Sequence, residues 1–189
     1  RRFVEVFRDS EVIVAPSGSC VTTVFTHYPE LLRESPELKD EVESLRNRTF
    51  ELSQYLVDVM GVENIGSTLP QPTRVAYHDC CHALRDLGVA RQPRQLLQAV
   101  DGLELVEMTD STNCCGFGGT FSVKYPEISM AILNEKLGHV ESSGADVLTA
   151  VDASCLMHMG GAMRRQSMKA RPMHIAELLA SGLPGGMNA

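Results

Sequence analysis

The chain has 189 residues, of which 43% are hydrophobic and 22% charged, and its formal net charge is −7. This composition is that of a soluble globular protein with room for one ordinary domain, or for two small ones that share a core. The acidic balance argues against nucleic acid and anionic membranes as partners. No apolar run approaches the roughly 20 residues of a transmembrane segment.

The first residues, Arg1-Arg2-Phe3-Val4-Glu5, lack the apolar stretch of a secretory signal. Two vicinal pairs among six cysteines, in a chain without such a signal, favour reduced thiols and a cytoplasmic location over disulfides. The chain also has no initiating Met and starts inside a predicted helix, so we expect a fragment of a longer protein. The six cysteines are Cys20, Cys80, Cys81, Cys114, Cys115 and Cys155.

The first third of the chain predicts a helix, a short strand and two further helices. The end of a helix over 1–9 precedes an apolar strand over 11–15, and the turn after it leads Cys20 into a helix that runs to residue 31. Ser35-Pro36 predicts the start of a long helix, whose apolar spacing continues to Val59 before Gly61. We interpret the Gly-, Pro- and Ser-rich segment 62–72 as a linker.

The rest of the chain alternates short apolar strands with helices. Strands are predicted over 73–77, 103–106 and 146–150, and helices through 84–87, over 93–100 and 126–141, from 154 or 155, and over 173–179. This alternation predicts an α/β fold with a mainly parallel sheet and flanking helices. Functional loops of such sheets gather at the carboxyl ends of the strands. Every cysteine-bearing stretch follows a predicted strand, so we expect the cysteines at one edge.

An internal repeat relates the two parts of the chain. Residues 11–20 align without a gap on 146–155, with four identities, and residues 50–56 match 173–179 more loosely in the same order. We therefore predict two pseudo-repeats, of which the first is incomplete. Residues 1–61 form the closing part of the first repeat, and residues 73–189 form the complete second one.

The cysteine pattern indicates a site for a soft metal. Cys114 and Cys115 run directly into a loop with three glycines, which suits a backbone that wraps a bulky group. Thiolates prefer zinc, copper(I) and iron–sulfur clusters. From Cys81 to Cys114, Cys115 and Cys155 the cysteines are separated by 32, 0 and 39 residues. This differs from zinc knuckles and from the compact ferredoxin run, and spacing alone leaves zinc and iron–sulfur both open.

Several motifs resemble those of the CCG (cysteine-rich) domain family, which includes a subunit of heterodisulfide reductase and the iron–sulfur subunit of glycolate oxidase. The similarity covers nearly the whole chain and is strongest to the lactate utilization protein A type. The motifs that carry it are His78-Asp79-Cys80-Cys81-His82, Cys114-Cys115-Gly116-Phe117-Gly118-Gly119, Cys155-Leu156-Met157-His158, Pro16-Ser17-Gly18-Ser19-Cys20, residues 116–124 and Met173-His174-Ile175-Ala176-Glu177.

The resemblance implies an iron–sulfur electron-transfer subunit of a cytoplasmic complex that oxidises L-lactate, or alternatively glycolate, together with other subunits. It implies a [4Fe–4S] cluster held by Cys81 as the lone ligand, Cys114 and Cys115 as the pair, and Cys155 as the last cysteine. The sequence departs from the family pattern at Asp152, where a further cysteine would stand, and likewise at Ser17. Four thiolates remain in the second repeat, which is enough for a cubane cluster but not for a five-cysteine noncubane one.

Weaker candidates and alternatives accompany this interpretation. Cys20, Cys80 and His158 are weaker candidate ligands. His78 and His82 flank the ligand loop, where a histidine can tune or replace a ligand, but we interpret both as structural or solvent-facing. A zinc-binding structural subunit and a thiol–disulfide redox protein like heterodisulfide reductase are the alternative functions. The sequence has no nicotinamide or flavin fingerprint and no clear base–arginine pair, so catalytic residues stay unknown and the dehydrogenation step calls for another subunit.

Overall fold

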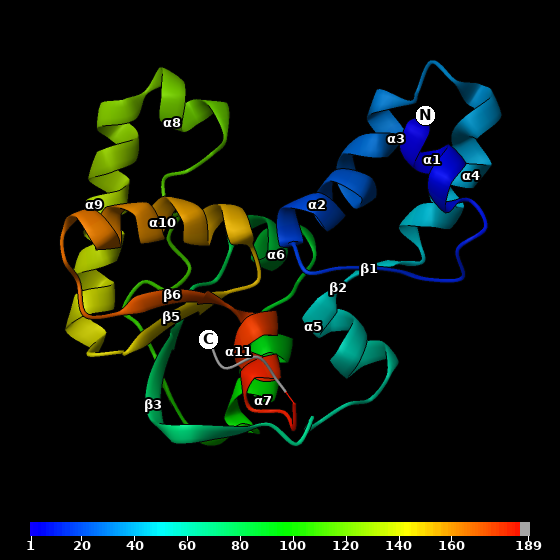
Figure 1. The fold of residues 1–189 in the computed structure, drawn as a ribbon. Helices are drawn as coiled ribbons and strands as arrows, with labels where there is room; N and C mark the ends of the chain where they lie inside the picture. The colour runs from blue at the N-terminus through cyan, green and yellow to red at the C-terminus, as the bar shows by residue number, and fades with distance from the viewer. Residues whose placement is uncertain (186–189) are drawn as a thin grey trace.

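The structure, a computed structural model, describes residues 1–185 and has an α/β fold in which helices flank two parallel sheets (Figure 1). The elements up to residue 59 are α1 (Arg2–Phe7), β1 (Ile13–Ala15), α2 (Gly18–Thr22), η1 (Thr23–His27), α3 (Tyr28–Leu31), η2 (Pro36–Leu38), α4 (Lys39–Arg46), β2 (Thr49–Glu51), α5 (Leu52–Gln54) and η3 (Tyr55–Val59). Those that follow are β3 (Thr68–Tyr77), α6 (Cys81–Asp86), α7 (Arg91–Gln98), β4 (Asp101–Val106), α8 (Thr120–Lys124), α9 (Pro126–Ser143), β5 (Val147–Ala150), α10 (Ala153–Arg165), β6 (Arg171–His174) and α11 (Ile175–Ser181).

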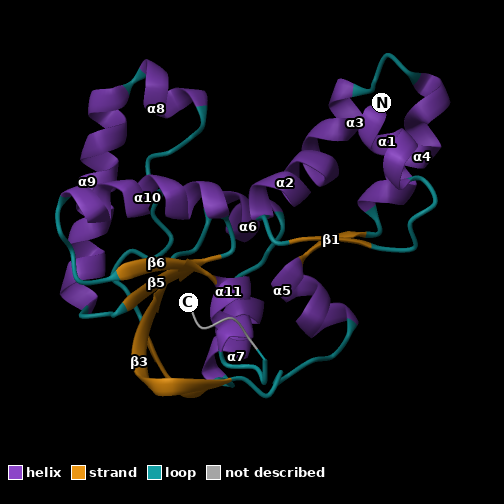
Figure 2. Ribbon diagram, viewed as in Figure 1, coloured by secondary structure: helices purple, strands orange, loops and turns teal. Residues whose placement is uncertain are grey.

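The larger sheet has the strand order β4-β3-β5-β6, and all neighbouring strands run parallel. In the centre of this sheet, Val75 of β3 pairs with Leu105 of β4 and with Val147 of β5. Helix α10 covers one side of β5 and β6, while α7 and α11 lie on the other side (Figure 2). Covering both faces buries every residue of β5, as expected for an apolar run of this kind.

The smaller sheet consists of β1 and β2, which are also parallel and pair Ile13 with Thr49. It belongs to a separate apolar cluster of Val4, Ile13, Val42 and Leu45. Figure 1 shows this part of the chain, from α1 to α4, set to one side of the larger sheet.

A close helix contact joins the two parts. A Cβ atom on Gly18, in the first turn of α2, would lie only 2.7 Å from the Cβ of Ala83 in α6. Glycine at this position therefore allows α2 to approach α6. Beside it, the Thr22 hydroxyl donates a hydrogen bond to the His82 carbonyl oxygen at 3.4 Å.

The predicted α/β class with parallel strands and flanking helices is confirmed, but two predicted helices were wrong in part. The long helix expected to reach Val59 is interrupted, because Thr49–Glu51 forms β2 and pairs with β1. The helix expected over 173–179 begins only at Ile175, since the residues before it form β6. Strand β3 begins at Thr68, inside the segment expected as a linker.

Matching local features occur where the two predicted repeats align. The pairs β1–β2 and β5–β6 are both parallel. Ser17 and Asp152, which are aligned, cap α2 and α10 with their side chains. Glu51 and His174, also aligned, each begin a capping box. A duplication would produce such features. The duplication and the division into repeats stay a prediction, and residues 186–189 of the second repeat lie outside the described residues.

Among residues 1–185, no helix combines the length and the apolar character that crossing a membrane requires.

Candidate metal centre

Three loops at the carboxyl ends of the larger sheet bring five of the six cysteines together. Cys80 caps the N-terminus of α6 and Cys81 is the first residue of that helix, just after β3. Cys155 lies in the first turn of α10, just after β5. Cys114 and Cys115 lie in the loop between β4 and α8. Parallel strands place these three loops at the same edge, as the sequence predicted.

The five side chains form a continuous series of neighbouring thiols. Cys81 interacts with Cys114, and Cys114 with Cys115. Cys115 interacts in turn with Cys155, and Cys155 with Cys80. We call this group, made of Cys80, Cys81, Cys114, Cys115 and Cys155, the five-thiol site. All four cysteines expected as ligands belong to it, and so does Cys80. Their role as ligands stays a proposal.

Cys20 has no such neighbours among the described residues. It lies in α2 with an exposed side chain, and its backbone N–H donates to the Ser17 hydroxyl at 3.3 Å. Its position after β1 resembles that of Cys155 after β5, as the aligned segments predict. The structure thus does not place this weaker candidate with the other cysteines.

The backbone of the glycine loop holds the Cys114 sulfur. The Gly116 N–H donates a hydrogen bond to Cys114 Sγ at 3.3 Å, and the Ser129 hydroxyl donates to the Gly116 carbonyl oxygen at 2.7 Å. Gly116 has φ +85°, and a Cβ there would lie 2.6 Å from the Ser129 carbonyl oxygen. Both facts require glycine, because side chains disfavour positive φ and no space is available. The loop therefore brings amide donors close to the sulfurs.

Hydrogen bonds among the thiols make Cys114 more acidic than Cys81, Cys115 and Cys155. Hydrogen bonds from the thiols of Cys115 and Cys81 to its sulfur lower the Cys114 pKa far below the ordinary value. The same bonds raise the pKa of Cys81 and of Cys115, and burial raises both further. The Cys115 thiol lowers the pKa of Cys155, but Cys80 and burial outweigh it and the net shift is upward. A metal that binds here must displace the remaining protons.

His78 is closer to the sulfurs than the sequence suggested. One of its ring nitrogens and the Sγ atoms of Cys115 and Cys155 all lie within 4.8 Å of one another. The side chain is 1% exposed, and neither ring nitrogen has a hydrogen-bond partner. Burial lowers the His78 pKa to about 4, so the imidazole is neutral at pH 7. The sequence hypothesis weighed His78 as a ligand but favoured a structural role, since burial cannot be read from the motif.

The other two histidines of the cysteine-bearing motifs have different surroundings. The His82 side chain is exposed, in agreement with the solvent-facing interpretation. His158 is half-buried, with Nε2 3.5 Å from the Ser129 hydroxyl and its ring packed on Phe117, at 5.6 Å between centroids. The His158 ring therefore packs against Phe117 of the glycine loop.

Asp152, which stands where the family pattern has a cysteine, is a buried helix cap. One carboxylate oxygen accepts from the N–H and the hydroxyl of Ser154, at 3.1 and 2.5 Å, and the other accepts from the Ser19 N–H at 2.8 Å. Burial alone would raise the Asp152 pKa, but the hydrogen bonds from Ser154 and Ser19 outweigh it and lower the pKa. Both oxygens already have donors.

Two buried charges that the sequence analysis missed support the loops. Asp79, next to Cys80, accepts two hydrogen bonds from the Arg94 guanidinium, each 2.7 Å long. Lys136 of α9 is 1% exposed, and its ammonium donates to the carbonyl oxygens of Asp110 and Ser111 at 2.5 and 3.1 Å. Burial lowers the Lys136 pKa. Neither pair has a spacing that stands out in the sequence, because the partners come from different elements.

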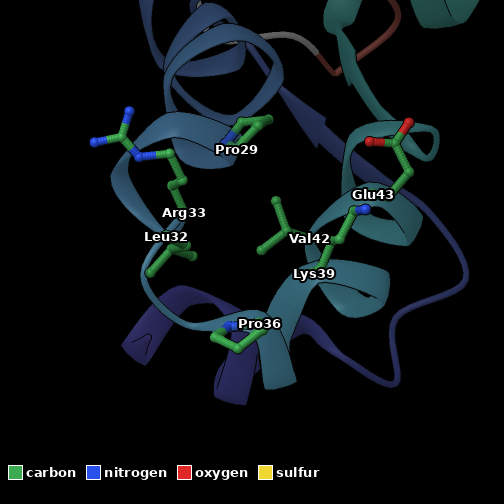
Figure 3. A pocket seen from close by; sticks show the side chains of 7 residues that line it. All are labelled: Pro29, Leu32, Arg33, Pro36, Lys39, Val42 and Glu43. Atoms are coloured by element: carbon green, nitrogen blue, oxygen red, sulfur yellow. The ribbon is translucent and has the colours of Figure 1, made fainter.

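A cavity of about 370 Å³ opens beside the five-thiol site. Its lining residues are Ser19, Cys80, Cys81, His82, Phe117, Gly118, Gly119, Asp152, Ser154 and Cys155. A second cavity, of about 330 Å³, lies among α3, η2 and α4 and is lined by Pro29, Leu32, Arg33, Pro36, Lys39, Val42 and Glu43 (Figure 3). Because no cysteine lines this second cavity, it does not belong to the site.

The donor set fits a soft metal or a metal–sulfur cluster. Five thiols and one unpartnered imidazole converge at the carboxyl edge of the sheet, and thiolates select zinc or iron–sulfur clusters over harder ions. The adjoining cavity offers more room than one ion needs. Metal binding is thus supported by the residues present, whereas the choice of metal is not.

Comparisons with known proteins point to the same part of the chain. The cysteine-rich domain family, CCG, matches residues 75–160, a range that contains the whole five-thiol site. The chain is 46% identical to lactate utilization protein A of Bacillus subtilis (strain 168), over 96% of this chain and 75% of that protein. It is 42% identical to lactate utilization protein A of Oceanobacillus iheyensis, over 99% of this chain and 75% of the relative. Lactate utilization protein A of Bacillus velezensis is 43% identical, again over 96% and 75%.

Proposed function

Because the chain belongs to the lactate utilization protein A family and carries its cysteine-rich domain, we propose that it takes part in lactate utilization as an iron–sulfur electron-transfer subunit. The observation that carries this proposal is the five-thiol site, in which three loops bring five thiols next to one another, beside a cavity lined by Cys80, Cys81 and Cys155. A [4Fe–4S] cluster, when bound, would supply one-electron transfer.

The residues of the chain would perform three tasks toward such a cluster. Cys81, Cys114, Cys115 and Cys155 would hold it, with Cys80 as a further thiol. The Gly116 N–H, which already donates to the Cys114 sulfur, would stabilise the negative charge of a thiolate ligand. The buried Lys136 ammonium would add a positive charge behind the same loop. Hydrogen bonds and nearby charge are two of the means by which proteins set the potential of a cluster.

The proposal places the dehydrogenation of L-lactate, or of glycolate, in another subunit of a cytoplasmic complex. It assigns no catalytic base in this chain. The chain would receive electrons from that subunit and pass them on. Partners can be sought by isolating the tagged protein from its host without oxygen, and lactate oxidation can be assayed in the isolated complex with the wild-type chain and with Cys115→Ser. We expect activity only with the wild-type chain.

A zinc-binding structural subunit is the second candidate, and one observation favours it. The ligand atoms of His78, Cys115 and Cys155 lie within 4.8 Å of one another, a spacing that a single tetrahedral ion can bridge. Zinc at this position would stabilise the fold and carry no electrons.

Metal analysis separates the two candidates. Protein isolated without oxygen is assayed for iron, acid-labile sulfide and zinc. Iron and sulfide in comparable amounts, with absorption at roughly 400 nm, support the electron-transfer proposal. One zinc per chain without iron supports the structural alternative, and no bound metal contradicts both.

A further inference from the structure

We infer that His78 is a nitrogen donor to the metal centre, alongside cysteine thiols. In a four-iron cluster, whose irons each take one protein ligand, it would stand in place of one thiolate. This inference rests on the proposed function in one respect, because it requires that the five-thiol site binds a metal. It does not depend on whether the metal is iron or zinc.

The backbone around His78 is fixed by the sheet. His78 follows directly after β3, and its N–H donates to the carbonyl oxygen of Thr149 in β5 at 2.9 Å. Its own carbonyl oxygen accepts from the Cys80 thiol at 3.8 Å. The residue is therefore held between the central strands and the cysteine loop. A ring held in this way needs little reorganisation to bind a metal.

The ring itself lacks partners. Both Nδ1 and Nε2 are buried, and neither has a partner at hydrogen-bond geometry in the described chain, although the backbone of Ser111 lies near the ring. Leaving a buried polar atom without a partner costs on the order of 1–3 kcal/mol, and native proteins rarely do so. An imidazole that is 1% exposed and has two such atoms indicates a partner from outside the chain. A metal between His78 and the sulfurs would satisfy one of the two nitrogens.

The distances allow this bond. The closest ring nitrogen and the Sγ atoms of Cys115 and Cys155 lie within 4.8 Å of one another. A tetrahedral ion bound at about 2.0 Å to nitrogen and about 2.3 Å to sulfur holds such atoms roughly 3.5–3.8 Å apart. Small side-chain rotations therefore bring all three ligand atoms onto one ion, or onto neighbouring irons of a cluster.

The side chain that replaces the expected cysteine does not compete for this place. The Asp152 carboxylate is occupied by the N–H groups of Ser19 and Ser154 and by the Ser154 hydroxyl. His82 is exposed, and His158 lies against Ser129 and Phe117. Of the three histidines in the cysteine-bearing motifs, His78 alone is buried with both ring nitrogens unpartnered in the described chain.

Pulsed electron paramagnetic resonance of the whole chain tests the inference. The protein is loaded without oxygen with iron and sulfide, reduced, and measured with natural histidine and with 15N-labelled histidine. We expect a strong nitrogen coupling that changes with the label, disappears in His78→Gln and persists in the control variants His82→Gln and His158→Gln. The midpoint potential of the centre should shift in His78→Gln only.

Other outcomes overturn the inference. A centre that contains iron and sulfide but shows no label-dependent coupling in the wild type excludes His78 as a ligand, and this result needs no variant to fold. A coupling that survives His78→Gln assigns the nitrogen to another histidine.

If the protein binds no iron, the proposed function fails and the inference is tested separately with Co²⁺. A labelled-histidine coupling in the Co²⁺ protein that His78→Gln removes still supports His78. Its absence, or a wild-type chain that binds no Co²⁺, overturns the assignment.

Discussion

The carboxylate of Asp152 accepts a hydrogen bond from the backbone N–H of Ser19 at 2.8 Å, across 133 residues of sequence. The bond joins the loop after β5, which leads to Cys155, to the loop after β1, which leads to Cys20. In the opposite direction, the Gly18 N–H donates to the Val151 carbonyl oxygen at 3.3 Å. The two loops thus hold each other, and the residue that departs from the family pattern has a defined structural role.

Replacing Asp152 by Ala is expected to lower the free energy of unfolding by about 2.5–4 kcal/mol. The change removes the cap of α10, usually worth about 1 kcal/mol, together with the charged hydrogen bond from Ser19, worth about 1.5–3 kcal/mol. Urea unfolding measures the loss. Asp152→Asn keeps an acceptor and should lose less, and Asp86→Ala, at an exposed site, should lose little. Equal stability of Asp152→Ala and the wild type would refute this role.

We expect Arg94→Ala to lower the stability as well, because it breaks the ion pair of Arg94 and Asp79. Asp79 is 2% exposed, and Arg94 contacts it through both terminal nitrogens and stacks over Tyr77, 5.0 Å from the ring centroid. Breaking a buried pair on one side costs about 3–5 kcal/mol, and partial exposure of Arg94 places the expected cost of Arg94→Ala near the lower end. Arg94→Lys should cost less than Arg94→Ala but not restore the wild-type value, because an ammonium cannot form the two-point contact.

Arg91→Ala provides the matched control for this experiment. Arg91 also forms an ion pair, with Asp58 at 2.8 Å, but its side chain is largely exposed. Exposed pairs contribute about 0–1 kcal/mol. Thermal or urea unfolding measures the stability lost in Arg94→Ala and in Arg91→Ala. Similar losses would show that the buried pair of Arg94 and Asp79 contributes no more than an exposed ion pair.

We expect the replacement of Lys136 to affect the metal centre. Its ammonium holds the carbonyl oxygens of Asp110 and Ser111, a few residues before the Cys114-Cys115 pair. Lys136→Met retains most of the buried volume but removes these hydrogen bonds. We expect faster amide hydrogen exchange in the loop over residues 110–116 and a lower metal content. Lys124→Met, in α8, should change neither quantity. Unchanged exchange and metal content in Lys136→Met would show that the loop does not need this charge.

Because the pKa of Glu51 is raised in the folded protein, we expect the free energy of unfolding to depend on pH through this residue. Burial raises the Glu51 pKa above 4.5, although hydrogen bonds from Ser53 and Gln54 oppose the shift. A raised pKa means that the folded state favours the protonated carboxyl. Its contribution is therefore complete below about pH 4.5 and is lost as the pH rises through the folded-state pKa.

The variant Glu51→Gln isolates this contribution, because its carboxamide oxygen can still accept from the N–H groups of Ser53 and Gln54. The free energy of unfolding of Glu51→Gln minus that of the wild type should increase from about pH 4.5 to about pH 8. Glu43→Gln, at an exposed ion pair with Arg46, serves as the control. A difference that does not vary with pH would show that the Glu51 carboxyl is not perturbed by folding.

The sequence predicted the parallel α/β class and the convergence of Cys81, Cys114, Cys115 and Cys155, because strand ends and cysteine positions are both visible in it. It could not separate Cys80 from Cys81, since adjacent residues at a helix start can both contact the site. His78 was interpreted as structural and not as a ligand. The lack of hydrogen-bond partners for its ring nitrogens depends on tertiary packing, which cannot be read from the sequence. Lys136 and Arg94 were missed for the same reason.

The strands β2 and β6 escaped prediction because each is short and runs directly into a helix. The apolar spacing around Val42, Leu45 and Leu52 continues at a helical period across β2 and hides it. In the structure, Glu51 with Gln54 and His174 with Glu177 form capping boxes that start the helices after these strands. Glu and His are not among the residues that mark a helix N-cap in a sequence, so these pairs gave no signal of a break.

Whether the five-thiol site holds an iron–sulfur cluster is tested most directly by the iron and acid-labile sulfide content of three chains reconstituted without oxygen. We predict iron and sulfide in comparable amounts in the wild type and in Cys20→Ser, whose side chain is exposed and outside the site. Cys115→Ser removes the thiol that joins Cys114 to Cys155 and should lose most of both. Equal iron and sulfide in Cys115→Ser and the wild type, or zinc in place of iron in the wild type, would contradict an iron–sulfur cluster at this site.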